Sequence, residues 1–368
     1  MPLRIVFTRS NPISPDPRVT RAADCLQRAG YFCKMLGWSR QREEREMPSV
    51  SLQISRMYFP GRFGGGIFNL LGLLVFNIWL FFKHMKIRPD LIHAFDLDTV
   101  LPALLASFIL KNYVIYDIAD WYADSRKIGF LRPVIEGLER WACKKARLVI
   151  LPHENRLQQI GFTPQKLLIF YNAPEDKEEP CASLMHYPSG SYFAYVGILQ
   201  QDRGIPQIIA AALAAGVNLI IAGFGPLADY CKDVADREKR IIFCGKVSYN
   251  EALFIERNAI AILALYSPDL RNNHFAAPNK LYEAMMLKRP LITTKDITLG
   301  DFVESKGIGA AVYYGDIGGL ADVLVSLASR SDQCKDMGNK ARHLYETQYS
   351  FSRQCRKLLA AYKQLQDI

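Results

Sequence analysis

The stretch YFAYVGILQQDRGIPQIIAAALAAGVNLIIAG, residues 192–223, contains the pattern that decides the fold. Two short β-rich apolar runs, residues 192–197 and 217–223, flank a helical pattern over residues 205–215. Strands that alternate with helices of about 10–15 residues are typical of parallel sheets with crossover helices. The stretch therefore predicts one strand–helix–strand unit of a sheet that helices cover on both faces.

The same alternation extends along the chain and occurs twice. Before the stretch, strands are predicted at 3–8, 90–95, 113–118 and 148–152, and helices at 18–29, 99–110 and 130–146. After it, strands are predicted at 241–245, 261–266 and 290–294, and helices at 226–237, 249–258 and 279–287. We predict an α/β fold of two doubly wound, Rossmann-like domains that face each other across a ligand-binding cleft. The predicted boundaries are 1–172 and 191–350 for the domains, 173–190 for a Pro-rich linker, and 351–368 for a terminal helix.

The charge of the chain is distributed unevenly between its two halves. The sequence is 50% hydrophobic and 22% charged, which excludes disorder for the bulk of the chain. The net charge is +10, and all of the excess lies in residues 1–172, which hold 24 basic and 14 acidic residues. Nucleic acid, an anionic membrane surface and a phosphate-bearing substrate are the partners that such a balance suits. The basic residues are spread singly and no nucleic-acid-binding motif is present, so we expect no nucleic acid partner.

The cysteines and the N-terminal sequence indicate the cellular compartment in which the protein is expected. The eight cysteines are scattered, without C-x-x-C pairs or clusters at metal-ligand spacing. They are typical of buried thiols in a reducing compartment. Residues 1–14 lack an apolar run before a small-residue cleavage site, so no secretory signal is predicted. We expect a cytoplasmic protein.

Residues 67–82 form an uncharged apolar segment with basic residues on both sides. One interpretation is a core helix beneath a sheet. Another is a helix that lies in the plane of a membrane surface, with Phe68, Trp79, Phe81 and Phe82 in the interface. A transmembrane span is the least favoured, because about 24 Å of helix is short for a hydrocarbon core of about 30 Å.

The stretch HFAAPNKLYEAMMLKRP, residues 274–290, carries the strongest signal for chemistry. Pro278 or Asn279 can begin a helix, which places Lys280 and Glu283 on one face. The helix N-terminus and Lys280 suit a phosphate, and Glu283 could accept hydrogen bonds from a ribose diol. On the residues alone, a surface Lys–Glu pair is the favoured interpretation.

Residues 278–292, PNKLYEAMMLKRPLI, resemble the nucleotide-sugar-binding segment of the family 4 retaining glycosyltransferases, which have the GT-B fold. Further stretches resemble that family in the same order along nearly the whole chain, at residues 14–31, 89–106, 116–125, 195–211, 220–226 and 341–365. The resemblance implies a donor site in the C-terminal domain and an acceptor site in the N-terminal domain. It also implies that the terminal helix can pack back on the N-terminal domain.

The resemblance also implies roles for individual residues. Glu283 would bind the ribose hydroxyls, and Arg203 and Lys280 would contact the donor diphosphate. The implied donor-binding residues are Gly197, Arg203, Gly223, Phe224, Gly225, Pro278, Asn279, Lys280, Leu281 and Glu283. The implied catalytic residues are Arg203, Lys280 and Asp120, and the implied acceptor-binding residues are Asp16, Arg18, Asp96 and His153. For Asp16 and Arg18, a local pair that pins a turn is an equal alternative.

The sequence departs from the family pattern at three positions. Phe275 stands where the family commonly has a second Glu, so the sugar contact is expected from Asn273 or from amides near residues 276–277. Ala119 replaces a His that contacts the donor, and Asp120 or Asp117 could take a related role. Ile198 follows the phosphate-loop glycine where a basic residue is often found.

The function expected from this resemblance is sugar transfer from a UDP- or GDP-linked donor to a glycan or lipid-linked acceptor with retention. The expected setting is bacterial surface polysaccharide synthesis at the inner face of the plasma membrane. No cofactor and no metal are expected, and Asp96 of the D-x-D at residues 96–98 is interpreted as an acceptor contact. Two alternatives stay open: a nucleotide-sugar 2-epimerase of the same architecture, and a non-enzymatic basic membrane-binding protein.

Overall fold

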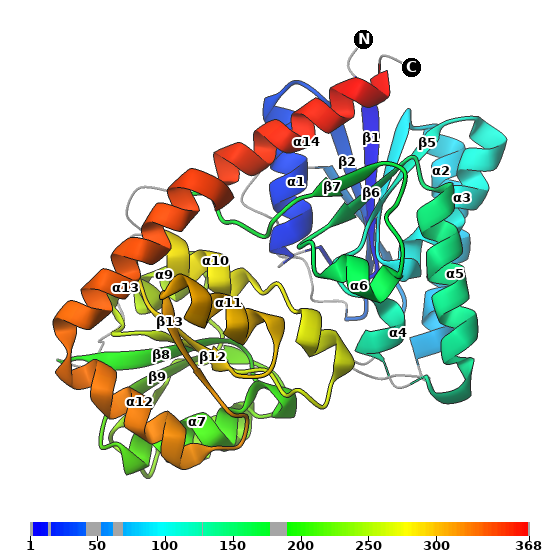
Figure 1. Cartoon of the computed structure of the whole chain (residues 1–368). Coiled ribbons are helices and arrows are strands. Elements are labelled where there is room, and N and C mark those ends of the chain that lie inside the picture. Colours follow the sequence, from blue (N-terminus) through cyan, green and yellow to red (C-terminus); the bar gives the residue numbers. More distant parts are fainter. Residues whose placement is uncertain are drawn as a thin grey trace. The chain divides into compact units, whose positions relative to one another are not determined.

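The computed structural model describes residues 3–13, 16–41, 53–61, 69–126, 128–176 and 190–366. The chain divides into two compact units (Figure 1). Residues 1–172 and 352–368 form unit 1, and residues 173–351 form unit 2. Phe68 and most of the predicted linker, residues 177–189, lie outside the described residues.

Unit 1 is built on a parallel sheet of seven strands in the order β3-β2-β1-β4-β5-β6-β7. The strands are β1 (Arg4–Arg9), β2 (Phe32–Ser39), β3 (Gln53–Tyr58), β4 (Leu91–Phe95), β5 (Tyr113–Asp117), β6 (Leu148–Leu151) and β7 (Leu167–Ile169). The strand order reverses between β1 and β4, which places the ligand-binding crevice of such a sheet after these two strands.

Helices cover both faces of this sheet. They are α1 (Pro17–Arg28), α2 (Leu70–Ile87), α3 (Leu97–Leu110), α4 (Tyr122–Ser125), α5 (Arg132–Lys145), α6 (Arg156–Ile160) and α14 (Phe351–Gln366). Figure 1 shows α2, α3 and α5 on one side of the sheet and α1 with α14 on the other. The hydroxyl of Tyr362 in α14 lies 2.7 Å from Nδ1 of His93 in β4, so the terminal helix is anchored in the core of unit 1.

Unit 2 repeats the architecture with a parallel sheet in the order β10-β9-β8-β11-β12-β13. Its strands are β8 (Tyr192–Ile198), β9 (Asn218–Phe224), β10 (Ile241–Phe243), β11 (Ile262–Ala264), β12 (Leu291–Thr294) and β13 (Gly309–Val312). Its helices are α7 (Ile205–Ala214), α8 (Ala228–Ala235), α9 (Tyr249–Asn258), α10 (Asn279–Met286), α11 (Thr298–Lys306), α12 (Ile317–Ser329) and α13 (Ser331–Leu344). The predicted α/β fold of two doubly wound halves is confirmed.

Three strands that lie at or near sheet edges were not predicted. β3 is half-exposed and lacks apolar alternation, β7 has only three residues, and β13 is made of small residues. Their pairing depends on a neighbouring strand more than on their own sequence. β2, next to the edge, also escaped prediction because Lys34 and Gly37 interrupt its apolar run.

Residues 70–82 of the apolar segment at 67–82 lie in α2, which packs on the sheet but is not fully buried as the core-helix interpretation had predicted. Only 22% of the 18 residues of α2 are buried, although the helix is long and apolar enough to cross a membrane by length and composition. Phe76 and Leu80 pack against Trp38 on β2, whereas Leu74 and Ile78 are more than half exposed on the opposite face. Of the predicted interface residues, Trp79 and Phe81 pack partly into the core, and Phe82 is exposed.

Candidate functional site

A pair of glycine-rich strand ends forms the base of the candidate site in unit 2. Gly223 has a φ of +149°, and a Cβ there would lie 1.8 Å from the carbonyl oxygen of Gly197. A Cβ at Gly225 would lie 2.5 Å from the carbonyl oxygen of Leu199. Only glycine permits so close an approach of the two backbones. The chain that follows β8 is thereby held against the turn that follows β9.

Arg203 lies directly after this contact. It ends a short 3-10 helix, Gln201–Arg203, and its guanidinium lies 4.5 Å from the centre of the Tyr266 ring. The backbone carbonyl of Asp202 accepts a hydrogen bond of 2.8 Å from the amide of Ser267. The loops that follow β8 and β11 are therefore joined at the position where the sheet of unit 2 reverses its strand order.

Lys280 lies between two carboxylates instead of forming the surface pair that residue patterns alone favoured. Its Nζ is 2.7 Å from Oε2 of Glu283 in α10 and 2.6 Å from Oε1 of Glu256 in α9. The hydroxyl of Tyr249 in α9 donates to Oε1 of Glu283 at 3.1 Å. Both carboxylates are buried, and the Lys280 side chain is 17% exposed. The group is therefore a largely buried network, and the Lys280 side chain is more exposed than the two carboxylates it contacts.

The electrostatics of this network link it to Arg203. Burial raises the pKa of Glu256 to about 7, with Lys280 opposing the shift and Glu283 adding to it. Burial also raises the pKa of the Tyr266 hydroxyl, while Arg203 and Lys280 both oppose this shift. Both cations are thus close enough to Tyr266 to act on its titration. Arg203 stacks on the Tyr266 ring, and both cations that the resemblance assigned to the diphosphate act on the hydroxyl of this residue.

The other predicted donor residues differ in their surroundings and exposure. Pro278 precedes α10, which begins at Asn279, and in the described part of the chain no side chain caps this helix start. Leu281 is buried in the core, so it could offer a ligand only its backbone, and its amide donates to the carbonyl of Pro278 at 3.2 Å. Phe224 is 41% exposed at the glycine turn, with the ammonium of Lys246 5.9 Å from its ring centre.

The groups expected to replace the missing Glu at Phe275 have other partners. Nδ2 of Asn273 donates to the carbonyl of Ser267 at 2.9 Å and to Oδ2 of Asp202 at 3.5 Å. The amide of Ala276 donates to the carbonyl of Asn273 at 3.2 Å. These contacts stabilise the loop before α10, so neither Asn273 nor the Ala276 amide is presented to a sugar here.

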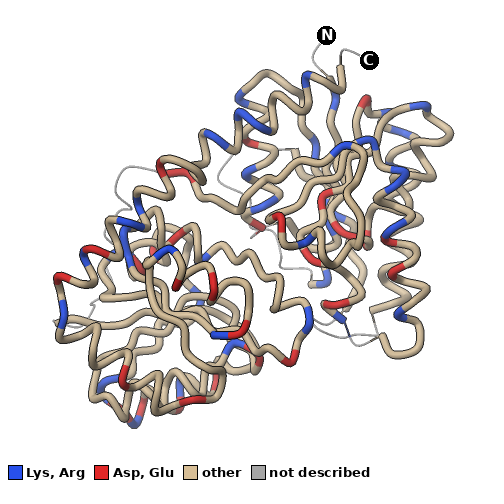
Figure 2. Tube along the Cα trace, in the orientation of Figure 1, with Lys and Arg blue, Asp and Glu red and all other residues tan. Residues whose placement is uncertain are grey.

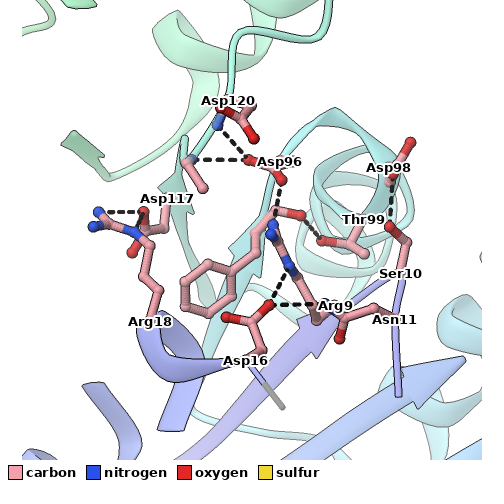
Figure 3. Close-up of polar contacts among 12 residues, drawn as sticks. Arg9, Ser10, Asn11, Asp16, Arg18, Asp96, Asp98, Thr99, Asp117 and Asp120 are labelled. Carbon is pink, nitrogen blue, oxygen red and sulfur yellow. Dashed lines mark hydrogen bonds and ion pairs between the residues drawn. The ribbon is translucent and has the colours of Figure 1, made fainter. Parts of the chain in front are cut away.

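In unit 1, the predicted residues Asp16, Asp96 and Asp120 lie in one polar cluster after β1, β4 and β5 (Figure 3). The guanidinium of Arg9 bridges two of them, with Nε 2.9 Å from Oδ2 of Asp16 and Nη1 paired with Asp96. Asp16 also accepts from the amide of Val19 as the N-cap of α1. Its carboxylate is thus largely used in stabilising the loop and the helix.

Asp96 joins the ends of β4 and β5. Its φ is +57°, an unusual value for a residue with a side chain. Its Oδ1 accepts from the amides of Ala119 at 2.8 Å and Asp120 at 3.2 Å. Burial raises the pKa of Asp96 to about 6, although Arg9 opposes the shift. The Asp120 side chain is half-exposed and accepts from Nη2 of the buried Arg156 at 3.1 Å.

Arg18 forms a buried, long-range ion pair, so the alternative of a local pair with Asp16 is wrong. Its Nη2 is 2.7 Å from Oδ1 of Asp117, and its Nη1 donates to the carbonyl of Phe170 at 2.9 Å. Oδ2 of Asp117 lies 3.2 Å from Nε2 of His93. Burial would raise the pKa of Asp117, but Arg18 and His93 outweigh it, so the pKa is lowered. The partner of Arg18 is the buried Asp117 and not its neighbour Asp16, which the alternative had assumed.

His153 lies in the loop after β6 and is partly exposed. Its Nδ1 accepts from the amide of Asn155 at 3.2 Å, so the neutral ring carries its proton on Nε2. Burial lowers the pKa of His153, and Arg156 adds to this while Glu154 opposes it. The histidine is a polar group of the same edge of unit 1, and it packs edge-on against Tyr171.

Residues 192–330 match the family model for glycosyl transferases group 1. Most of unit 2 is therefore similar to a glycosyl transferases group 1 domain. A search of curated protein sequences found no match to this chain.

Solved structures at low identity share the whole fold, which is GT-B. Sucrose-phosphate synthase from Thermosynechococcus elongatus is 14% identical, with a TM-score of 0.76 over 99% of this chain and 99% of that chain. HepE from Anabaena, solved in complex with UDP-glucose, is 14% identical, with a TM-score of 0.70 over 98% of this chain and 100% of that chain. A candidate UDP-N-acetylglucosamine 2-epimerase from Listeria monocytogenes is 12% identical, with a TM-score of 0.66 over 99% of this chain and 96% of that chain.

Sequence reasoning missed several residues of these clusters. Glu256 and Tyr249 both belong to the region that matches the family model and lie seven residues apart on α9, which places them on one face of that helix. A helix with that spacing was predicted, but its partner helix could not be identified from sequence. Arg9 and Arg156 were missed for a similar reason, since their carboxylate partners are distant in sequence.

Proposed function

We propose that this chain transfers a sugar from a UDP- or GDP-linked donor to a hydroxyl of a glycan or lipid-linked acceptor, with retention at the anomeric carbon. The observation that carries this proposal is Lys280 in the first turn of α10, paired with Glu283 and close to Arg203, within a region similar to a glycosyl transferases group 1 domain. Two cations and an uncapped helix start suit a diphosphate, and a carboxylate one turn deeper suits a ribose diol.

The chemistry follows from these groups. The bond between the anomeric carbon and the diphosphate oxygen breaks, the acceptor hydroxyl oxygen bonds to that carbon, and its proton passes to the departing diphosphate. Arg203 and Lys280 stabilise the negative charge that develops on the leaving group. We propose that these cations neutralise the diphosphate without a metal, so EDTA should leave turnover unchanged.

Unit 1 is proposed to bind the acceptor. Asp96, Asp120 and His153 lie at the carboxyl edge of its sheet, where doubly wound domains bind ligands. Carboxylates and an imidazole are suited to sugar hydroxyls. The proposed setting is bacterial surface polysaccharide synthesis in the cytoplasm.

A panel of nucleotide sugars tests the function. We expect one UDP- or GDP-linked sugar to raise the melting temperature of the protein, since a ligand that binds the folded state stabilises it. The same donor, incubated with glycan and lipid-linked acceptors, should release nucleoside diphosphate, and proton NMR should show the donor's anomeric configuration in the product. A donor that changes to its C2 epimer without any acceptor would instead establish the 2-epimerase alternative.

We also propose that unit 1 docks on an anionic membrane. Four apolar side chains of α2, spaced four positions apart, are exposed and form a stripe along the helix. They are Leu70, Leu74, Ile78 and Phe82. Phe108 on α3, which packs against α2, is 81% exposed. Lys83, Lys86 and Arg88 lie at the end of α2, and Figure 2 shows basic residues distributed over unit 1. Apolar side chains beside basic ones suit a surface with anionic headgroups.

Vesicle sedimentation tests this docking. We expect the protein to pellet with vesicles containing phosphatidylglycerol, and the variant with Lys83→Gln, Lys86→Gln and Arg88→Gln to bind at least tenfold more weakly. Each basic residue near such a surface contributes about 1 kcal/mol.

The control removes three exposed basic residues of unit 2, by Lys232→Gln, Arg237→Gln and Lys239→Gln. This variant should bind as the wild type does. Equal losses in both triple variants, or no wild-type binding at all, would contradict docking through α2.

A further inference from the structure

Glu256 is a fully buried carboxylate that the proposed reaction does not use directly. It lies in the last turn of α9, and its closest charged neighbour is the ammonium of Lys280 at 2.6 Å. An isolated carboxylate is costly to bury, so a buried one calls for a specific partner. The same helix holds Glu283 through the Tyr249 hydroxyl. One face of α9 therefore contacts both charged residues of α10 that the proposed donor site requires.

The geometry of the ammonium shows what Glu256 can do. A lysine ammonium has three donors. Among the described residues, two carboxylates lie within ion-pair distance of the Lys280 Nζ, those of Glu256 and Glu283. Glu256 is fully buried and Glu283 is 2% exposed, whereas the Lys280 side chain is 17% exposed. The two buried carboxylates thus face two of the three ammonium donors, which leaves the third donor for an anion.

The net charge that a donor diphosphate meets at this network depends on the protonation of Glu256. With both carboxylates ionised, the network of Glu256, Lys280 and Glu283 carries one net negative charge, which repels a diphosphate. With a proton on Glu256 the network is neutral, and the Lys280 charge is available to the diphosphate. Glu283 must stay ionised to accept hydrogen bonds from a ribose diol.

We propose that Glu256 is a positioning residue of the donor site, which orients Lys280 toward the donor diphosphate and takes up a proton when the donor binds. This inference rests on the proposed function. Glu256 touches no substrate, and it acts through Lys280.

The raised pKa of Glu256 supports the proton uptake. Burial raises that pKa to about 7, Lys280 opposes the shift, and Glu283 on the same neighbouring helix adds to it. Tyr249 faces the same network through Glu283. A bound diphosphate adds negative charge beside Glu256 and raises its pKa further. Donor affinity is therefore expected to fall as the pH rises through about 7.

The test measures the affinity of UDP-glucose and GDP-mannose between pH 6 and pH 8 by calorimetry. The diphosphate of these probes does not titrate in that range, so the protein's own groups cause any change. We expect the wild-type affinity for the probe that binds to fall about fivefold, which corresponds to a rise of about one unit in the pKa of Glu256 on binding. Glu256→Gln should vary less than twofold, because the amide still accepts from Lys280 but does not titrate. Glu238→Gln, at an exposed position of unit 2, should retain the wild-type profile.

A second measurement needs no variant. At pH 7, binding of the probe to the wild type should take up a fraction of a proton, seen as a dependence of the binding enthalpy on the buffer. Wild-type binding without proton uptake, or a Glu256→Gln profile equal to the wild type's, would overturn the role of Glu256 and leave the proposed function standing. No binding of either probe, or of any other nucleotide sugar, would overturn both.

Discussion

Replacing Arg203 with alanine is expected to lower turnover by about 10²–10³-fold, with the fold of unit 2 retained. Removal of one group that stabilises a developing charge has effects of this size. The Arg203 side chain is 25% exposed and stacks on Tyr266, and its ion-pair partner Asp202, at 3.6 Å, also accepts from Nδ2 of Asn273. We therefore expect its loss to cost little stability. Turnover with the donor from the nucleotide-sugar panel measures the effect, and the melting temperature reports on the fold.

Lys280 requires a different variant, because its structural and catalytic effects would otherwise be mixed. Lys280→Ala would leave the buried Glu256 and Glu283 without a cation, which costs about 3–5 kcal/mol of stability. Lys280→Arg retains the charge but shifts the donor atoms, so we expect a loss of turnover with a smaller loss of stability. Lys232→Ala, at an exposed position of the same unit, serves as the control. Near-normal turnover in both Arg203→Ala and Lys280→Arg would argue against the proposed function.

Replacing Arg18 with methionine is expected to destabilise unit 1 by about 3–5 kcal/mol. Its Nη2 is 2.7 Å from Oδ1 of Asp117, and neither side chain is more than 6% exposed. The variant would leave the Asp117 carboxylate buried with the neutral His93 as its neighbour. Urea unfolding measures the loss.

Two further variants and a pH series show whether Arg18→Met destabilises unit 1 by removing an ion pair or by changing the side-chain packing. Lys86→Ala, at an exposed position of unit 1, should stay within about 0.5 kcal/mol of the wild type. Adding Asp117→Leu to Arg18→Met should restore part of the stability, because the unpaired charge is then removed as well. The lowered pKa of Asp117 stabilises the fold above its unfolded value of about 3.9, and this contribution is lost as the pH falls through the folded pKa. Arg18→Met should therefore lose less stability on acidification than the wild type.

Local patterns were sufficient for the central strands and for the helix starts. β4 and β8 are apolar runs that are buried on both sides of their sheets, so their sequences predict them without knowledge of their neighbours. The start of α10 at Asn279 after Pro278 follows from the fixed φ of proline. The glycines at 223 and 225 were also recognised, and the close backbone contacts explain why no other residue fits there.

The surroundings of charged residues could not be predicted in the same way. The Lys280–Glu283 spacing is the same for a solvated pair and for a buried network, and the difference is made by Glu256 on another helix. Arg18 and Asp117 are distant in sequence and meet only because the fold brings the first turn of α1 near the end of β5. For α2, the apolar composition was evident, but which face is covered depends on Trp38 of β2.

Residues 192–223 illustrate the difference between properties that local sequence determines and properties that tertiary contacts determine. By itself the sequence determined the two parallel sheets and the location of the glycine-rich turns, because periodicity and backbone restriction act over a few neighbouring residues. The roles of Arg203 and Lys280 came from the resemblance to a family and stay a prediction. Only the tertiary structure decided which charges are buried, which carboxylates face Lys280, and that α2 exposes an apolar stripe. These properties depend on desolvation and on pairs of groups that the chain brings together from distant positions, so no local pattern contains them.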